Sequence, residues 1–298
     1  MSFDYRELID PVFFSRLESI ELRARSIVEG SMHGLHRSPY LGMSVEFSSH
    51  REYAPGDDLR HLNWKLYARH DRLYIKEYDA DTNLNLYLLV DASASMGCAN
   101  AGRSKLHYAA SLAAALAHLA LSQRDAVGLT LFADSVLAHI PPKAKAHQLD
   151  EILATIANCV LQPATGTEKA LHLAAGLARR RGLVVLISDL FGEPEAIARG
   201  LDHFRYLNHE VLLFHLMDPT ERDLAIDGNI RFRDMESGET LTTQTEGIRE
   251  AYQAAVNQWR EAIEVECRKR AIDRVELVTS DPPDRAILDY LIKRAKAF

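Results

Sequence analysis

The sequence predicts an α/β fold, a doubly wound and mostly parallel sheet flanked by helices. From Asn83 onward, short apolar runs alternate with longer segments whose apolar residues recur at helical spacing. The apolar runs are nearly continuous, which is typical of strands buried on both faces of a parallel sheet. With 298 residues, 47% of them hydrophobic, the chain is long enough to bury such a core.

The chain before Asn83 has a different pattern. Apolar residues at helical spacing predict a first helix, and Gly30 is placed to end it. We expect that helix over 11–29, an extended segment over 44–53, a turn over 54–58 and a strand over 72–78. The sequence therefore predicts an amino-terminal segment of residues 1–82 packed on a main domain of residues 83–298.

The elements of the main domain follow from the same periodicities. We expect strands near 84–90, 126–132, 183–188, 210–216 and 274–279. We expect helices near 104–122, 146–159, 168–181, 194–206 and 247–271, and a last one from Asp284. The run Arg179-Arg180-Arg181 is expected to close the third of these helices, where basic residues interact favourably with the helix dipole. Alternation over about 229–243, around Ser237 and Gly238, predicts an inserted hairpin.

Oxygen-bearing side chains follow the first strand of the main domain. Asp91, Ser93 and Ser95 form a D-x-S-x-S loop directly after an apolar run. Oxygen ligands of this kind suit Mg²⁺ or Mn²⁺, but one loop cannot complete an octahedral shell. We therefore expect further ligands beyond neighbouring strands, from Asp189 and from Thr165, with Thr167 as the alternative threonine. A turn in which Asp and Ser only cap the next helix remains the alternative.

The order of these residues resembles the metal-ion-dependent adhesion site of von Willebrand factor type A domains. The matching residues are Asp91, Ser93, Ser95, Thr165 and Asp189. The resemblance implies that the serines and the threonine hold the ion directly and that the aspartates often act through water. It also implies an open coordination position for an Asp or Glu of a partner protein, and hence a non-enzymatic binding module.

A second motif lies ahead of the main domain. It contains Arg51, Tyr53, Pro55, Gly56, Asp57, Asp58, Arg60, Trp64, Ala68 and Arg69. This motif resembles the signature of the bacterial family called domain of unknown function 58, with Asn63 where many members have an acidic residue. The resemblance covers about 34–217. It implies a von Willebrand factor A-like domain after the motif. It also implies that the protein works with a MoxR-type AAA+ ATPase in complex assembly or maturation.

From the residues themselves, we interpret the charges of this motif as structural. Asp57, Asp58, Arg60 and Arg69 are expected to form an ion-pair network that ties the segment to the sheet. Trp64 is expected to be an anchor at the same junction. This interpretation ranks above direct contact with a ligand.

Composition excludes several other classes of protein. The 35 Lys and Arg against 42 Asp and Glu make a net charge of −7, which argues against a nucleic-acid partner. The sequence lacks a secretion signal, a membrane-spanning apolar run and a phosphate-binding Gly-rich loop. Cys98, Cys159 and Cys267 have no metal-ligand spacing, so we expect a reducing, cytoplasmic setting.

Two other functions remain open. One is a metal-dependent hydrolase that uses the same ion, for which Glu193 and Glu168 are the best of a weak set of general bases. The other is a scaffold that keeps the fold without the ion.

Overall fold

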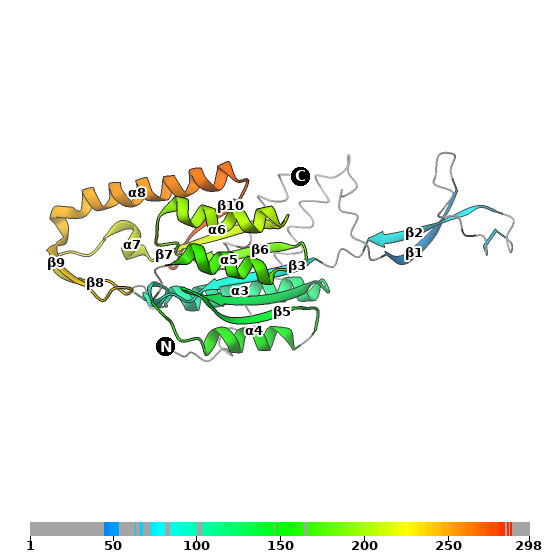
Figure 1. Cartoon of the computed structure of the whole chain (residues 1–298), viewed down its shortest axis with the longest axis horizontal. Helices are drawn as coiled ribbons and strands as arrows, with labels where there is room; N and C mark the ends of the chain where they lie inside the picture. The colour runs from blue at the N-terminus through cyan, green and yellow to red at the C-terminus, as the bar shows by residue number, and fades with distance from the viewer. Residues whose placement is uncertain are drawn as a thin grey trace. The chain divides into compact units, whose positions relative to one another are not determined.

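A computed structural model describes residues 45–53, 63, 66–67, 72–80, 84–99, 103–145, 147–163, 166–283, 285 and 287 (Figure 1). The described residues form two compact units, one before residue 84 and one from Leu84 onward. The helix predicted over 11–29, the turn over 54–58, and the last helix apart from positions 285 and 287 lie outside the described residues.

The first unit contains an antiparallel pair of strands, β1 (Val45–Glu52) and β2 (Tyr74–Ala80). The pairing runs from Glu52 opposite Tyr74 to Val45 opposite Ala80, with an irregularity between Phe47 and Ser49. Both strands lie where the sequence predicted extended chain.

The second unit is built on one six-stranded sheet with the order β10-β7-β6-β3-β4-β5. These strands are β3 (Asn85–Asp91), β4 (Ala126–Phe132), β5 (Val136–Lys143), β6 (Leu183–Ser188), β7 (Glu210–Met217) and β10 (Asp273–Val278). All neighbours are parallel except β4 and β5. From β3 the chain winds toward one edge of the sheet through β4 and β5, and from β6 onward it winds toward the other edge. The sheet is therefore doubly wound, and the predicted fold class is confirmed.

The edge strand β5 was not predicted. Pro141 and Pro142 lie within this strand and interrupt its apolar pattern, so its periodicity is weak. Proline is tolerated here because β5 lies at the edge of the sheet and, among the described strands, pairs with β4 alone.

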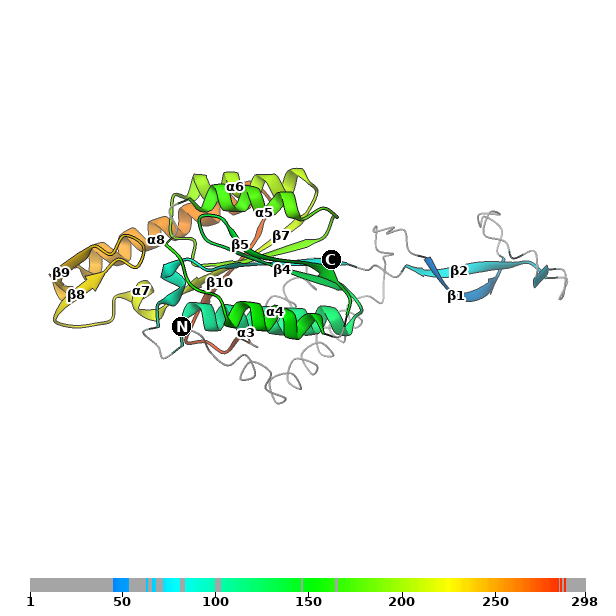
Figure 2. The same cartoon turned by 60° about the horizontal axis from the view of Figure 1, so that its bottom comes forward.

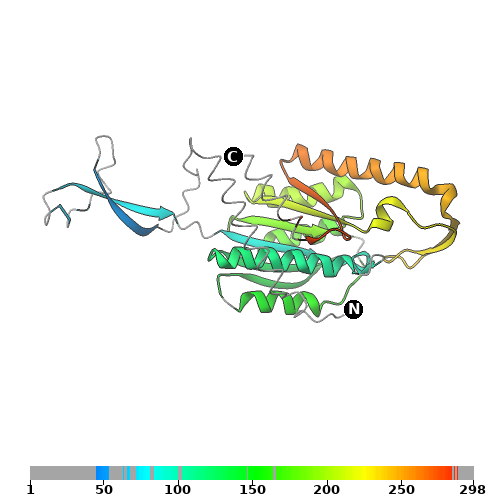
Figure 3. The ribbon, with the colours of Figure 1, turned by 180° about the vertical axis from the view of Figure 1, so that it is seen from behind.

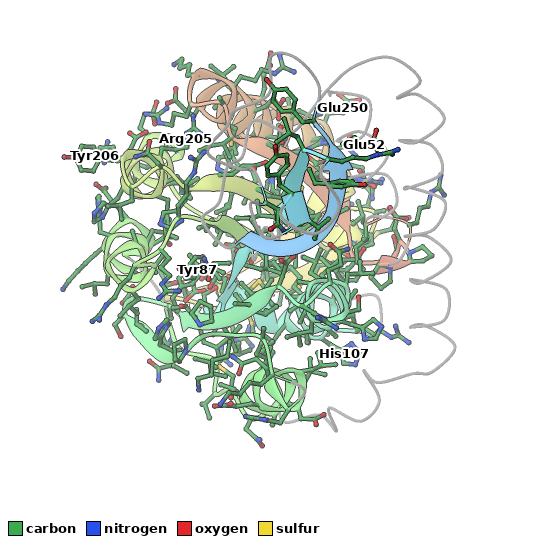
Figure 4. All side chains as sticks on the ribbon, turned by 90° about the vertical axis from the view of Figure 1, so that its right-hand side faces the viewer. Glu52, Tyr87, His107, Arg205, Tyr206 and Glu250 are labelled. Carbon is green, nitrogen blue, oxygen red and sulfur yellow. The ribbon has the colours of Figure 1, made fainter. Side chains whose placement is uncertain are left out.

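Helices cover both faces of the sheet (Figure 2). On one face lie α3 (Lys105–Ser122) and α4 (Gln148–Ala157). On the other lie α5 (Thr167–Leu177), α6 (Pro194–Tyr206) and the later turns of α8 (Thr245–Lys269). Strand β3 serves both cores, because Leu88 packs in the first and Leu89 in the second. Tyr87 also faces the second core, whereas Tyr206 projects outward from the end of α6 and is 83% exposed (Figure 4).

The predicted helix over 168–181 is four residues too long, because α5 ends at Leu177. Beyond it, the hydroxyl of Tyr87 donates to the carbonyl of Arg180 and accepts from the amide of the same residue. This tertiary contact takes the backbone groups that a longer helix would use. The Arg179-Arg180-Arg181 run therefore lies after the helix, and its predicted place at a helix terminus was wrong.

The inserted hairpin is confirmed as β8 (Asn229–Arg233) and β9 (Thr240–Gln244). A short helix that was not predicted, α7 (Pro219–Asp223), precedes it. Asp218 caps this helix by accepting from the amide of Thr220, and Glu221 accepts from the amide of Asp218. None of the helices in the described part of the chain is long and apolar enough to span a bilayer.

Candidate metal centre

The predicted site lies where the winding of the sheet reverses. Strands β3 and β6 are parallel neighbours, with Val90 opposite Ile187. Asp91 ends β3, and Asp189 follows directly after β6. In open α/β sheets, ligands bind outside the carboxyl ends of the strands at such a switch point. The topology therefore brings the two predicted carboxylates to the position where a ligand is expected.

Asp91 is held from both sides and is almost completely buried. Its Oδ1 atom accepts a hydrogen bond from the amide of Ser93 at 2.8 Å, and its Oδ2 atom accepts from the hydroxyl of Ser188 at 2.5 Å. Burial, and second to it the negative charge of Asp189, raise the pKa of Asp91 well above its usual range. A positive charge between the two aspartates would oppose both effects.

The two predicted serines lie side by side in the loop after Asp91. The Oγ atoms of Ser93 and Ser95 are 3.0 Å apart, and both side chains are buried. The short 3₁₀ helix η3 (Ala94–Gly97) sets this arrangement by turning the chain between them. Two neighbouring ligands of an octahedral Mg²⁺, each about 2.1 Å from the ion, lie about 3.0 Å apart. The hydroxyl pair therefore fits one edge of a magnesium shell.

The candidate metal ligands are side-chain hydroxyls together with two carboxylates. Among the described residues, no three or more His, Cys, Asp or Glu side chains are grouped so that they could hold a metal ion. Any ion at this loop would therefore depend on the hydroxyl oxygens, a set that suits a hard cation such as Mg²⁺ or Mn²⁺.

The threonine ligand is not located by the described residues. Thr165 lies outside them, and Thr167 is the first residue of α5. Next to it, the amide of Gly166 donates to Asp134 Oδ1 at 2.7 Å. Of the second motif, Arg51 lies in β1 and Tyr53 follows it. The remaining predicted residues of that motif, Pro55, Gly56, Asp57, Asp58, Arg60, Trp64, Ala68 and Arg69, lie outside the described residues.

A buried lysine that the sequence did not single out lies at the site. Lys105 Nζ lies 2.6 Å from Asp189 Oδ2 and 2.7 Å from Glu221 Oε1, and its side chain has no exposed surface. Burial alone would lower the pKa of Lys105, but Asp189 and Glu221 together raise it above its usual value. Lys105 begins α3 after the cap residue Ser104, where a lysine is ordinarily solvated. The sequence therefore offered no signal for its role.

A second unpredicted residue comes from the inserted hairpin. Glu236, in the loop between β8 and β9, accepts a hydrogen bond from the amide of Ser95 at 2.8 Å. The two residues are 141 positions apart, so no local pattern could have related them.

The backbone at Asp189 is held from behind by a buried histidine. His215 Nε2 lies 3.0 Å from the carbonyl oxygen of Asp189, and its Nδ1 lies 2.6 Å from the guanidinium of Arg274. Because arginine only donates, Nδ1 accepts and Nε2 carries the proton. Burial, with a smaller effect of Arg274, lowers the pKa of His215 to about 4. His215 therefore stays neutral and keeps this orientation at neutral pH.

A groove of about 840 Å³ lies between the first turns of α5 and α6. Its lining includes Thr167, Glu168, His172, Phe191 and Glu193. Phe191 follows Asp189 by two residues, is 49% exposed and stacks on Trp259 with ring centroids 5.6 Å apart. An apolar ring thus stands beside the carboxylate site on an open surface.

The chain resembles several known proteins. An uncharacterized protein of Mycobacterium tuberculosis is 30% identical over 236 residues, which cover 78% of this chain and 74% of that protein. The crystal structure of the conserved hypothetical protein BatB from Bacteroides thetaiotaomicron is 18% identical, with a TM-score of 0.47 over 72% of this chain and 100% of that one. The VWA domain of SpRpn10 is 12% identical, with a TM-score of 0.37 over 72% of this chain and 95% of that one.

The second motif and most of the sheet domain, up to α8, fall within one known family. The model of that family matches residues 49–262, which span most of the described chain. The chain belongs to the family described as Protein of unknown function DUF58.

Proposed function

We propose that this protein is a non-enzymatic protein-binding module that holds Mg²⁺ or Mn²⁺ at Asp91, Ser93, Ser95, Asp189 and Thr165, or at Thr167 in its place. The observation that carries the proposal is the pair of buried serine hydroxyls, 3.0 Å apart, beside the buried carboxylate of Asp91. When bound, the ion supplies an electrostatic attraction for a carboxylate of the partner. The chain itself orients the oxygen ligands and limits their contact with water.

The surface around the site supports capture of a protein. The groove beside Asp189 offers the half-exposed ring of Phe191, and aromatic side chains are enriched where proteins bind one another. A partner that presents an Asp or Glu flanked by apolar residues would match both features. On the strength of the family resemblance, we extend the proposal to a MoxR-type AAA+ ATPase as that partner, and to assembly or maturation of complexes as the setting.

The proposal includes a cytoplasmic location. Cys98, Cys159 and Cys267 form no disulfide with one another, which supports a reducing compartment.

Hydrolysis is a weaker candidate. Both carboxylate oxygens of Glu168 accept from the guanidinium of Arg199, at 3.1 and 2.9 Å. These hydrogen bonds, with a smaller effect of the charge of Arg199, hold the pKa of Glu168 below its usual value, and a general base needs the opposite shift. Glu193, the other candidate base, is the cap residue before α6, and its side chain makes no capping hydrogen bond.

A metal-free scaffold is the second candidate, and one observation favours it. Lys105 already brings a positive charge to Asp189, so the carboxylates are partly neutralised without an ion. The two candidates differ in whether the protein binds a divalent cation at all.

Calorimetric titration of Mn²⁺ and Mg²⁺ into metal-stripped protein separates them. We expect one saturable site in the wild type and its loss in Asp91→Asn, which keeps the size of the side chain. Asp150→Ala, on the exposed side of α4, removes a carboxylate elsewhere and should bind like the wild type. No heat of binding in a folded wild type would refute the ion site and favour the scaffold.

A further inference from the structure

The inserted hairpin ends at the candidate ion site. Within the part of the chain that the structure describes, strands β8 and β9 pair only with each other, and most of their side chains are exposed. Figures 1 and 3 show the hairpin running from the start of α8 back to the turn between β3 and α3. A two-stranded hairpin on its own is marginally stable in water. Its position over the site therefore needs contacts at the tip.

Those contacts join the tip to the metal loop. Glu236 accepts from the amide of Ser95 at 2.8 Å, and Ser95 also carries one of the two hydroxyls of the predicted ion shell. Beside it, the Cε atom of Met235 lies 3.6 Å from the position that a β-carbon on Gly97 would take. An acid and an apolar side chain of the same chain thus cover the D-x-S-x-S loop.

The tip is shaped so that Glu236 points at this loop. The Oδ1 atom of Asp234 accepts from the amides of Glu236 and Ser237, at 2.7 and 3.2 Å. The backbone closes between Asp234 and Glu239, and Gly238 takes a positive φ of 76° that completes the turn. Because the loop is ordered by its own hydrogen bonds, little entropy is lost when Glu236 reaches the site.

From this geometry we infer that Glu236 is an in-chain ligand of the cation site, which occupies the place of a partner's carboxylate until the partner displaces it. The inference rests on the proposed function, since it requires the ion. Glu236 carries a carboxylate, as the partner residue is expected to, and this carboxylate accepts from the backbone amide of Ser95, a serine of the proposed ion shell. The hairpin then sets a minimum affinity for a partner, because the partner's carboxylate must displace a tethered acid that is present at high effective concentration.

Mn²⁺ binding to four metal-stripped proteins tests the inference. They are the wild type, Glu236→Gln, Glu236→Ala and Glu239→Gln. The last removes the same charge from an exposed position on the same tip and serves as the matched control. Gln at position 236 keeps an oxygen that can accept from the Ser95 amide, so it separates loss of the ligand charge from loss of the hydrogen bond.

We expect both Glu236 variants to bind Mn²⁺ about tenfold more weakly than the wild type and Glu239→Gln. Water-proton relaxation of the Mn²⁺-loaded proteins should rise in Glu236→Ala, because water takes the vacated position. A blocked Gly-Glu-Gly peptide should bind Mn²⁺-loaded Glu236→Ala about fivefold more tightly than it binds the wild type, since no in-chain acid competes with it.

The results that overturn the inference are distinct from those that overturn the ion site. If all four proteins bind Mn²⁺ with equal affinity and relaxation, Glu236 only caps the Ser95 amide, and the ion site stands. If Glu236→Gln behaves like the wild type while Glu236→Ala shows only increased amide exchange in the hairpin, the contact is structural. If no folded protein of the set binds Mn²⁺, both the inference and the proposed function fall.

Discussion

The ammonium of Lys105 lies 2.6 Å from Oδ2 of Asp189, and both side chains are almost completely buried. The lysine also contacts Glu221, so two carboxylates from different elements share one cation. Lys105 thereby joins the first turn of α3 to the residue that follows β6 and to helix α7. A buried charge of this kind is tolerated only with its partners in place.

Lys105→Met should therefore destabilise the fold strongly. The substitution preserves length and apolar stem but leaves two acids without their cation in a buried site. We expect a loss of about 3–5 kcal/mol in the free energy of unfolding, measured by urea denaturation. Lys169→Met, at an exposed position of α5, is the matched control and should change stability by less than about 0.5 kcal/mol. Equal stability of the two variants would contradict a paired role for Lys105.

Ser95→Ala tests whether the pair of serine hydroxyls holds the ion, and it does so without removing a charge. We expect Mn²⁺ affinity to fall at least about tenfold while the circular dichroism spectrum stays unchanged. The control is Ser122→Ala at the end of α3, where the hydroxyl donates only to the carbonyl of Leu119. Calorimetry checks both, and unaltered affinity in Ser95→Ala would remove the hydroxyl pair from the ion shell.

Gly182→Ala should destabilise the start of β6. A β-carbon at this position would lie 2.1 Å from the carbonyl oxygen of Asn85, which belongs to the neighbouring strand β3. The backbone must shift to make room, at a cost of about 1–3 kcal/mol in the free energy of unfolding.

Gly176→Ala is the matched control for this change. Gly176 lies inside α5 with nothing within 4 Å of the added carbon. Since alanine favours helix, we expect a gain of up to about 1 kcal/mol. Urea denaturation that showed the two variants shifted in the same direction would contradict the close approach of β3 and β6.

His209 should make stability depend on pH. Its Nε2 donates to the carbonyl of Ala178 at 3.0 Å, and burial lowers the pKa of the imidazole below its usual value of about 6.5. The unfolded chain then binds a proton more readily than the folded chain. The contribution is fully present above about pH 6.5 and is lost as the pH falls toward the lowered pKa.

Urea midpoints between pH 7.5 and about pH 5 measure this effect. The raised pKa of Asp91 stabilises the fold as the pH falls, in the direction opposite to His209, so the comparison with the variant isolates His209. We expect acidification to change the midpoint less favourably in the wild type than in His209→Gln. Some dependence should persist, because burial lowers the pKa of His215 in the same direction. His147→Gln, at an exposed position, should keep the full slope. An identical slope in all three proteins would exclude a contribution from His209.

The sequence by itself determined the local features of this protein. Asp91, Ser93 and Ser95 fall on one loop because they are neighbours in the chain after a buried strand. Most strands and helices of the main domain could be predicted because their periodicities are local. The hairpin could be predicted because turn residues separate two runs of alternating residues. The end of α5 could not be predicted, because Tyr87 decides it from another strand.

Only the tertiary structure decided which distant groups meet. The winding of the sheet brings Lys105 to Asp189 across 84 residues, and the hairpin of β8 and β9 brings Glu236 to Ser95 across 141. No periodicity records such pairs, because they depend on the order of strands and on the direction in which a hairpin folds back. The edge position that admits two prolines in β5 has the same origin. Local patterns determine which elements form, and burial in the folded chain determines which charges must be paired.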